Sequence, residues 1–378
     1  MSGKVTFDGA PERGTINFSV GQPSADLLPL GLLGGAGARF FADAEPLELN
    51  YGQRQGDARF RAALAAFLAE SSGAAVEPDS LMLTGGISQA LDFVCGRFAR
   101  PGDLVVVEEP SYPYSFQIFR DHGLEVAGVP VDGAGMDVAA LERLLATRKP
   151  RLVYVIPAFH NPTGQVMGRA RRERLVALSR EHGFVIVADE VYQFLHHGEP
   201  PPPSFGALGA AGRALSLGTF SKILAPGLRL GWIQTTPDLM KTLLASGALV
   251  SGGNFNHFTS HVVRQVLERG ELAPFVATLR ERYAERAAAM DAALRRHLGG
   301  VARWSRPGGG YFFWLELPEG ADAGNLEAAA RAAGTGFLPG SFCSVDGSLR
   351  HCMRLSFAHY GVADIHEGIA RLRRALIP

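Results

Sequence analysis

The feature that most constrains the fold is a regular alternation that begins near residue 80. Short apolar segments rich in β-branched residues alternate with longer segments whose apolar residues recur at helical spacing. The segments predicted as strands span residues 80–84, 104–108, 152–157, 184–189, 214–218 and 230–235. Several are apolar on both faces, as strands buried in a parallel sheet are. The pattern therefore predicts an α/β protein with a mostly parallel sheet covered by helices.

The pattern changes after residue 240, where long helical segments follow one another. The longest, residues 272–300, leads to a C-terminal region with two further predicted strands, GYFFWLELP and CMRLSFA. A chain of 378 residues, 47% of them hydrophobic, is long enough for one large domain and a smaller one. We expect residues 1–44 to form an N-terminal arm and part of the small domain, 45–275 the large domain, and 276–378 a small α+β C-terminal domain.

The composition favours a small-molecule ligand over a macromolecular one. Thirty-seven basic residues balance thirty-seven acidic ones, so no overall charge attracts nucleic acid or an anionic membrane. The N-terminus lacks the apolar core of a signal peptide, and no apolar stretch approaches the roughly 20 residues of a membrane span, which predicts a cytoplasmic protein. The cysteines Cys95, Cys343 and Cys352 match neither a disulfide framework nor a metal-binding spacing, and no metal site is predicted.

Functional side chains are expected where the strands end, because ligands of open parallel sheets bind beyond the carboxyl ends of the strands. The segment LTGGISQAL closes one strand and opens a helix. The backbone N–H groups around Gly86, Ile87 and Ser88 are suited to an anion such as phosphate. A turn of this kind also occurs simply as a tight connection between a strand and a helix.

Three further strands end in side chains that suit a ligand. Asp189 closes the strand of VADEVY, where a carboxylate is costly unless it meets a cation or an N–H group or caps the next helix. Tyr192 follows three residues later. Asn161 stands before a proline in HNPTG and is pushed towards extended geometry, and Tyr112 in EEPSYPY presents a flat ring either to a ligand or to the core.

The segment SLGTFSKILAPGLRLGWI holds the most informative residue, Lys222. A charged ammonium is expensive to desolvate in a cleft, whereas a neutral amine is a nucleophile for a carbonyl group. Arg229 would lower the lysine pKa further and offers a planar fork to a phosphate, while Thr219 and Ser221 add hydroxyl groups. A ligand with a carbonyl and a phosphate would use all four residues, and the alternative is an ordinary surface lysine.

Together, these segments resemble the fold type I enzymes that use pyridoxal 5′-phosphate (PLP), specifically the class I and II aminotransferases related to aspartate aminotransferase. The matching segments, in the order of that family, are TGGISQAL, EEPSYPY, NPTG, ADEVY, FSKILAPGLRLGW and MRLSFA. The resemblance runs from about residue 17 to the C-terminus. It implies a seven-stranded, mostly parallel sheet in a large PLP-binding domain, with a smaller α+β domain beside it.

The resemblance also implies a role for each residue that lines the cofactor site. Lys222 would form a Schiff base with PLP and later move a proton between the substrate Cα and the cofactor. Asp189 would pair with the pyridine nitrogen, Asn161 and Tyr192 would hydrogen-bond the 3′ oxygen of the ring, and Tyr112 would stack on its face. The implied phosphate ligands are Gly86, Ile87, Ser88, Thr219, Ser221 and Arg229. Ile87 departs from the family pattern, since it offers only a backbone N–H.

The implied substrate and partner contacts lie elsewhere in the chain. Arg354 in MRLSFA matches the arginine that binds the substrate α-carboxylate, alongside Asn161. Gly21 belongs to a segment that would close over the substrate. Tyr51 resembles the tyrosine that reaches the phosphate of the partner subunit, which implies a homodimer with shared active sites.

The implied reaction is the transfer of an amino group between an L-amino acid and a 2-oxo acid by a ping-pong mechanism. PLP-dependent lyases, β- or γ-substitution or cyclising enzymes, and amino-acid oxidases are the first alternative, because they pass through the same substrate carbanion. A PLP-sensing domain of a transcription regulator is the second. Such domains follow a basic helix-turn-helix region, whereas here the arm begins close to Met1 and the net charge is zero.

Overall fold

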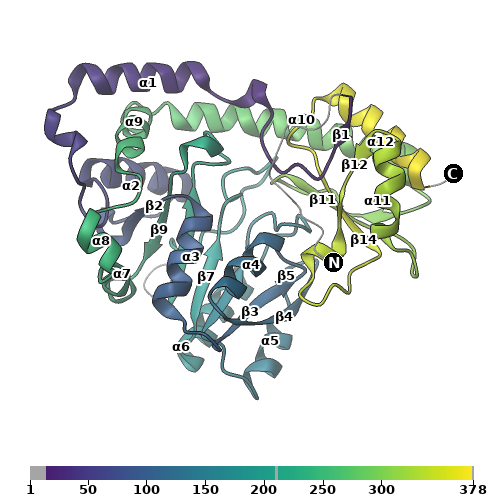
Figure 1. Cartoon of the computed structure of the whole chain (residues 1–378), viewed down its shortest axis with the longest axis horizontal. Helices are drawn as coiled ribbons and strands as arrows, with labels where there is room; N and C mark the ends of the chain where they lie inside the picture. The colour runs from purple at the N-terminus through teal and green to yellow at the C-terminus, as the bar shows by residue number, and fades with distance from the viewer. Residues whose placement is uncertain (1–13, 209–211, 377–378) are drawn as a thin grey trace.

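The computed structural model describes residues 14–208 and 212–376 and is built around an eight-stranded mixed sheet (Figure 1). The spatial order of its strands is β2-β9-β8-β7-β6-β3-β4-β5. Their bounds are Leu81–Thr84 (β2), Leu104–Glu109 (β3), Glu125–Asp132 (β4), Gly135–Met136 (β5), Leu152–Val155 (β6), Val185–Asp189 (β7), Ala214–Thr219 (β8) and Gly231–Thr235 (β9). The strands β4, β3, β6, β7 and β8 are parallel, whereas β9 runs antiparallel to both of its neighbours.

The expected α/β fold with a mostly parallel sheet is confirmed, and all six segments predicted as strands contain one. The sequence did not predict β4, because its residues EVAGVPVD are only partly buried and include a glycine and a proline. The two-residue strand β5 pairs with the end of β4 and raises the strand number from the expected seven to eight.

Helices cover both faces of this sheet, and the alternation of side chains along each strand decides which face a residue supports. Val105 and Val107 of β3 pack with α3, α4 and α7, whereas Val106 packs with α5 and α6. The bounds of these helices are Ile87–Phe98 (α3), Pro113–Asp121 (α4), Val138–Leu145 (α5), Arg169–His182 (α6) and Pro237–Leu244 (α7).

Four further helices lie at the β2 end of the sheet (Figure 1). They are Leu30–Asp43 (α1), Ala58–Ser72 (α2), Gly247–Gly252 (α8) and His257–Glu268 (α9). Short 3₁₀ turns connect the elements at Ala25–Leu27 (η1), Pro46–Leu49 (η2), Pro78–Ser80 (η3), Pro226–Leu228 (η5) and Gly340–Cys343 (η6). No helix in the described part of the chain is both long and apolar enough to cross a membrane.

The helix α10 (Leu272–Leu298) runs from this region to a second, four-stranded sheet of order β10-β11-β14-β13 (Figure 1). The remaining elements are Arg303–Trp304 (β10), Phe312–Glu316 (β11), Leu338–Pro339 (β13), Cys352–Ser356 (β14), Ala323–Ala332 (α11) and Val362–Leu376 (α12). The strand β1 (Ile16–Asn17) pairs with β12 (Thr335–Gly336) beside α12. The N-terminal strand is thus joined to the C-terminal region, and the first thirteen residues of the chain lie outside the described residues. The domain boundaries remain a prediction.

Candidate active site

The turn that follows β8 carries Lys222, and distant parts of the chain converge on its amine. Lys222 Nζ donates a 2.8 Å hydrogen bond to the carbonyl oxygen of Gly21, from the N-terminal segment. The same nitrogen lies 5.2 Å from the ring centroid of Tyr311, which directly precedes β11. The predicted nucleophile and the segment predicted to close over the substrate are therefore in contact.

The surroundings of Lys222 favour the neutral form of its amine. Burial lowers the pKa of Lys222 to about 8 from its ordinary value of 10.5. The positive charges of Arg354 and Arg229 act in the same direction, and Asp189 opposes them. The sequence identified only Arg229 as the neighbouring cation, and the structure adds Arg354 with a larger effect. An amine with this pKa is available as a nucleophile near neutral pH.

Asp189 is the last residue of β7, and its side chain is only 4% exposed. Its Oδ2 accepts a 2.8 Å hydrogen bond from the hydroxyl of Tyr154 in β6, and its Oδ1 accepts a long one of 3.4 Å from the backbone N–H of Val191. Burial raises the pKa of Asp189 to about 6, although the hydrogen bond from Tyr154 lowers it. Residues 191–194 form a turn, so this aspartate does not cap an α-helix.

Arg354 of β14 lies at the junction of three segments and is 5% exposed. Its two terminal nitrogens donate 2.9 Å hydrogen bonds to Oδ1 of Asn161 and to the carbonyl oxygen of Ser19. The guanidinium carbon lies 4.1 Å from the ring centroid of Phe312. Its Nε is buried without a hydrogen-bond partner among the described residues. The guanidinium of Arg354 is therefore a desolvated cation that is suited to bind a carboxylate.

Two tyrosines line the space between these charged groups. Tyr112 immediately precedes α4, and Tyr192 packs edge-on against Phe312 at a centroid distance of 6.0 Å. Burial holds the pKa of both phenols above their usual range. The charge of Asp189 raises the pKa of Tyr112 further, which places this ring near the carboxylate. Both hydroxyl groups therefore remain protonated donors at neutral pH.

The expected anion-binding residues gather where α3 begins. Gly86 directly precedes the helix with φ of 88°, and Ile87 and Ser88 form its first turn. A Cβ on Gly86 would lie 3.1 Å from Nη2 of Arg229, so a glycine is required both by the backbone and by the approach of the guanidinium. Thr219 Oγ1 lies 2.9 Å from Ser221 Oγ and accepts a 3.1 Å hydrogen bond from the backbone N–H of Ser221.

Comparison with known proteins identifies the family of the chain that carries this site. The family model described as "Aminotransferase class I and II" matches residues 13–372. The chain belongs to this aminotransferase family. Among its curated relatives, the 2-aminoadipate transaminase of Thermus thermophilus is 36% identical over 96% of this chain and 90% of its own length. The aromatic-amino-acid aminotransferase 1 of Thermococcus litoralis is 33% identical over 96% and 88%.

The aminotransferase also matches a solved structure that holds a cofactor derivative. The α-aminoadipate aminotransferase of Thermus thermophilus, complexed with N-(5′-phosphopyridoxyl)-L-leucine, superposes with a TM-score of 0.87 and 35% identity over 96% of this chain and 92% of that one. The cofactor of this aminotransferase is therefore PLP. The site fits PLP at its phosphate end. Because Gly86 has no Cβ, the start of α3 leaves space for a phosphate directly beside the Arg229 guanidinium.

The aminotransferase site contains residues that the sequence did not single out. Tyr154 appeared only as part of an apolar strand, yet its hydroxyl bonds Asp189. Glu108, at the carboxyl end of β3, accepts a 2.7 Å hydrogen bond from the backbone N–H of Ile156 and lies 3.2 Å from Nε2 of His160. A charged residue at the end of an apolar strand was the available signal for Glu108, as it was for Asp189.

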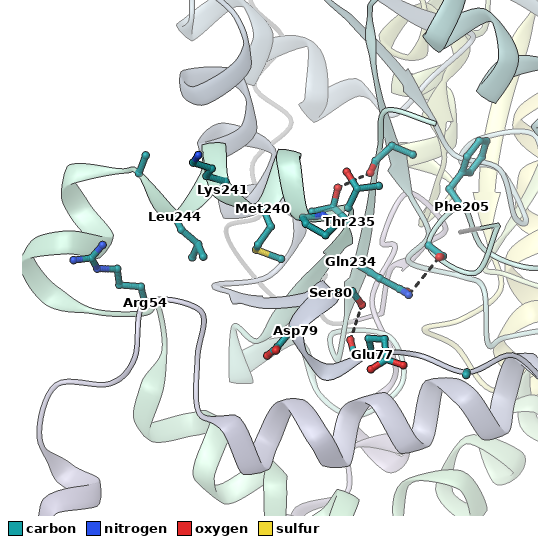
Figure 2. A pocket seen from close by; sticks show the side chains of 16 residues that line it. Arg54, Glu77, Asp79, Ser80, Phe205, Gln234, Thr235, Met240, Lys241 and Leu244 are labelled. Carbon is teal, nitrogen blue, oxygen red and sulfur yellow. Dashed lines mark hydrogen bonds between the residues drawn. The ribbon is translucent and has the colours of Figure 1, made fainter. Parts of the chain in front are cut away.

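A groove elsewhere on the aminotransferase, of about 870 Å³, is distinct from this site (Figure 2). It is lined in part by Ala214 at the start of β8 and Thr235 at the end of β9. Because Lys222 follows the other end of β8, the groove opens at the opposite end of the sheet. The described residues also contain no group of three or more histidine, cysteine, aspartate or glutamate residues arranged to hold a metal ion.

Proposed function

We propose that this aminotransferase moves an amino group between an L-amino acid and a 2-oxo acid by a ping-pong mechanism, with Lys222 as the residue that bonds PLP covalently. The observation that carries the proposal is the half-buried amine of Lys222, whose pKa burial and the charge of Arg354 lower to about 8. A neutral amine attacks a carbonyl carbon, and the same amine accepts a proton from the substrate Cα once it is released.

The proposed cofactor contacts follow the charges of the site. When bound, PLP supplies an electron-withdrawing ring that stabilises negative charge at the substrate Cα. Asp189 pairs with the ring nitrogen, Asn161 and Tyr192 donate to the ring oxygen, and Tyr112 covers one face of the ring. The phosphate is held by the backbone N–H groups of Gly86, Ile87 and Ser88 and by Thr219, Ser221 and Arg229.

The proposed substrate contacts centre on Arg354. Its buried guanidinium binds the α-carboxylate of the amino acid, and Asn161 and the ring of Phe312 hold it in place. Gly21 lies over the reacting amine, and the hydrogen bond that Lys222 donates to its carbonyl oxygen breaks when the amine reacts. The segment 19–21 therefore contacts both ends of the site.

Replacing Lys222 by alanine tests this function. We expect the variant to lose amino transfer and the visible absorbance that PLP gains when a lysine amine binds it covalently. The matched control is Lys241→Ala, which removes an exposed lysine from α7 and leaves both signals unchanged. Retention of either signal in Lys222→Ala would remove the proposal.

A second measurement separates amino transfer from the lyase, substitution, cyclising and oxidase alternatives. The PLP-loaded protein is incubated with an amino acid and no 2-oxo acid. A ping-pong aminotransferase converts one equivalent of amino acid per site and stops with its cofactor in the amine form. Continued turnover under these conditions would favour the alternatives.

We also propose that the protein is a homodimer in which Tyr51 reaches the site of the partner subunit. The side chain of Tyr51 is 84% exposed and accompanies other exposed large apolar residues of α1, η2, α8 and α9. These are Leu30, Phe41, Leu47, Leu49, Val250 and Phe258. An apolar surface of this kind marks a protein interface. The predicted cytoplasmic location stays a prediction.

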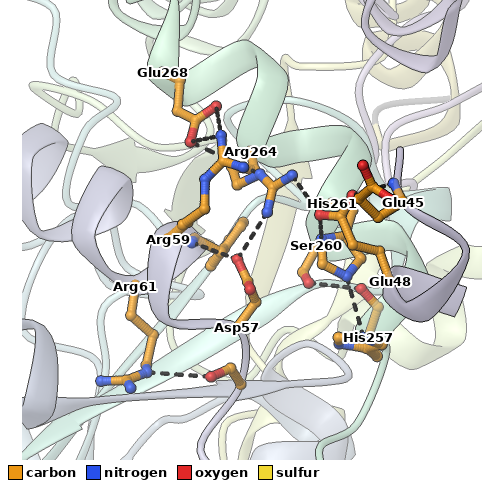
Figure 3. A network of polar contacts seen from close by, with 12 residues as sticks. Glu45, Glu48, Asp57, Arg59, Arg61, His257, Ser260, His261, Arg264 and Glu268 are labelled. Atoms are coloured by element: carbon orange, nitrogen blue, oxygen red, sulfur yellow. Dashed lines mark hydrogen bonds and ion pairs between the residues drawn. The ribbon is translucent and has the colours of Figure 1, made fainter. Parts of the chain in front are cut away.

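A polar network under the exposed apolar residues connects α9 with η2 (Figure 3). The buried guanidinium of Arg264 in α9 bonds Glu48 of η2 at 2.8 Å and Asp57 at 3.2 Å. The buried ring of His261 stands beside the same glutamate, with its Nδ1 3.6 Å from Glu48 Oε1. The network fixes η2, and with it the segment that leads to Tyr51.

Hybrid dimers test the shared site. The variants Tyr51→Phe and Lys222→Ala are mixed, dissociated and allowed to reassociate. If each site combines Lys222 of one subunit with Tyr51 of the other, one of the two sites in every hybrid is intact, and the mixture regains activity that neither variant has alone. A mixture that stays at the sum of its two components, or a wild-type protein that sediments as a monomer, would contradict this arrangement.

A further inference from the structure

Tyr154 lies beneath the proposed cofactor site and is fully buried, with 0% of its surface exposed. It belongs to β6, where it is paired with Val187 of the neighbouring parallel strand β7. Asp189 is two residues beyond Val187 and therefore points to the same face of the sheet. The long side chain of Tyr154 covers this two-residue distance along the strand, and its hydroxyl lies 2.8 Å from Asp189 Oδ2.

This hydrogen bond makes the two oxygens of the Asp189 carboxylate different. Oδ2 accepts the hydrogen bond from the hydroxyl of Tyr154, whereas the only contact of Oδ1 among the described residues is the long one of 3.4 Å with the backbone N–H of Val191. Because its existing contact is the weaker one, Oδ1 is the oxygen that is better able to accept a further hydrogen bond. The tyrosine thus selects which oxygen is offered and in which direction.

The tyrosine itself is packed in the protein interior and donates its hydrogen bond to the carboxylate. Its ring packs edge-on against Phe119 of α4, at a centroid distance of 5.6 Å, within a fully apolar cluster. Burial and the negative charge of Asp189 hold the pKa of Tyr154 well above its usual range. The hydroxyl therefore keeps its proton at neutral pH and donates its hydrogen bond to Asp189.

We propose that Tyr154 is a positioning residue for amino transfer: its hydroxyl fixes the Asp189 carboxylate so that one oxygen faces the ring nitrogen of bound PLP. The inference rests on the proposed function, because it takes Asp189 as the partner of that nitrogen. Tyr154 acts through Asp189 and has no assigned contact with cofactor or substrate.

The charged and titratable groups around Asp189 determine the sign of the expected effect. They are Tyr154 in β6, Glu108 at the end of β3, Tyr112 before α4, Tyr192 after β7, Lys222 after β8 and Glu190 next in the chain. Burial and Glu108 raise the pKa of Asp189, whereas the Tyr154 hydrogen bond and Lys222 lower it. Loss of the hydroxyl therefore raises this pKa above its present value of about 6.

The test is Tyr154→Phe, which removes one oxygen atom and keeps the ring. PLP affinity and the visible spectrum of the PLP-loaded protein are measured from pH 5 to pH 9. We expect the acid-side midpoint of both to rise by about one pH unit, and PLP affinity at pH 7 to fall about tenfold, the effect of losing one hydrogen bond to a charged group. The control is Tyr360→Phe, whose hydroxyl accepts a 2.8 Å hydrogen bond from the backbone N–H of Asn17 far along the chain; it should move neither midpoint.

Two further variants keep the outcome decisive. Glu108→Gln removes a charge that raises the pKa of Asp189 and should shift the midpoint in the opposite direction, to lower pH. In an Asp189→Asn background, Tyr154→Phe should have no further effect on the midpoint, because its acceptor is no longer ionised. A wild-type midpoint and affinity in Tyr154→Phe would overturn the inference while leaving the proposed function intact. A wild-type protein that gains no visible band with PLP would instead overturn the proposed function, and with it the role of Asp189.

Discussion

Replacing Asp189 by asparagine should make the PLP-free protein more stable at neutral pH, although it damages the site. The carboxylate is 4% exposed, and burial raises its pKa from the ordinary 3.8 to about 6. A shift of that size corresponds to about 3 kcal/mol of unfavourable free energy when the group is ionised. Lys222 loses an attractive partner in the variant, which reduces the gain. We expect about 2 kcal/mol of added stability at pH 7.5.

The pH dependence of this gain has a definite sign. Because the folded-state pKa is raised, the folded protein binds more protons than the unfolded chain between the ordinary value of 3.8 and about 6. The cost of ionising Asp189 is therefore absent below about pH 4, grows across this window and is complete above about pH 6. The stability of Asp189→Asn relative to wild type should follow the same course.

Urea unfolding of the PLP-free proteins at several pH values between 4 and 8 measures this difference. The control is Glu319→Gln, which neutralises a carboxylate in an exposed turn and should change stability little at any pH. An Asp189→Asn variant that is less stable than wild type at pH 7.5, or whose advantage is the same at pH 4, would refute the reasoning about burial.

Three further predictions concern the other charged parts of the site. Gly86→Ala should cost about 1–2 kcal/mol of stability, because φ is 88°, and should weaken PLP binding, because its Cβ would lie 3.1 Å from Arg229 Nη2; unfolding and PLP titration measure both effects. Arg354→Lys should raise KM for both substrates more than it lowers kcat, since an ammonium lacks the fork that binds a carboxylate at two points. The rate at which the PLP-free protein acquires the visible band should increase with pH, with a midpoint near 8, as Lys222 loses its proton; stopped-flow absorbance follows it.

The sequence predicted most of the main sheet because its buried strands are continuous apolar segments. The strand β4 escaped prediction because it is half-exposed and interrupted by Gly128 and Pro130, so neither alternation nor continuous apolarity marks it. The antiparallel direction of β9 was not predicted either, because its residues are as apolar as those of the parallel strands. Direction is set by the short connection after Lys222, which leaves no room for a crossover helix.

From the residues alone, the candidate site could be predicted where a side chain follows a strand, whereas Arg354, which lies inside β14, was identified only through the family resemblance. Asp189, Asn161 and Lys222 all stand at such ends, and the fold brings them together as the topology requires. Tyr154 is inside a strand, where a tyrosine is indistinguishable from a core residue until its hydroxyl is seen to have a partner. The family resemblance implied a role for the Gly21 segment, but the hydrogen bond from Lys222 to the carbonyl oxygen of Gly21 was not predicted, because any residue can supply a backbone carbonyl.

Burial shifts the pKa values of Lys222 and Asp189 in opposite directions, and this explains why the two groups lie together. It favours a neutral amine at Lys222 and a protonated acid at Asp189, with pKa values of about 8 and about 6. Between these values the folded protein keeps both groups charged, at a cost that their mutual attraction only partly offsets. A ligand that bonds the amine covalently and offers a cationic ring nitrogen to the carboxylate removes both costs at once. Stabilisation by PLP should therefore be larger at pH 7 than at pH 5, where Asp189 is largely protonated, and thermal unfolding with and without PLP at the two pH values measures that difference.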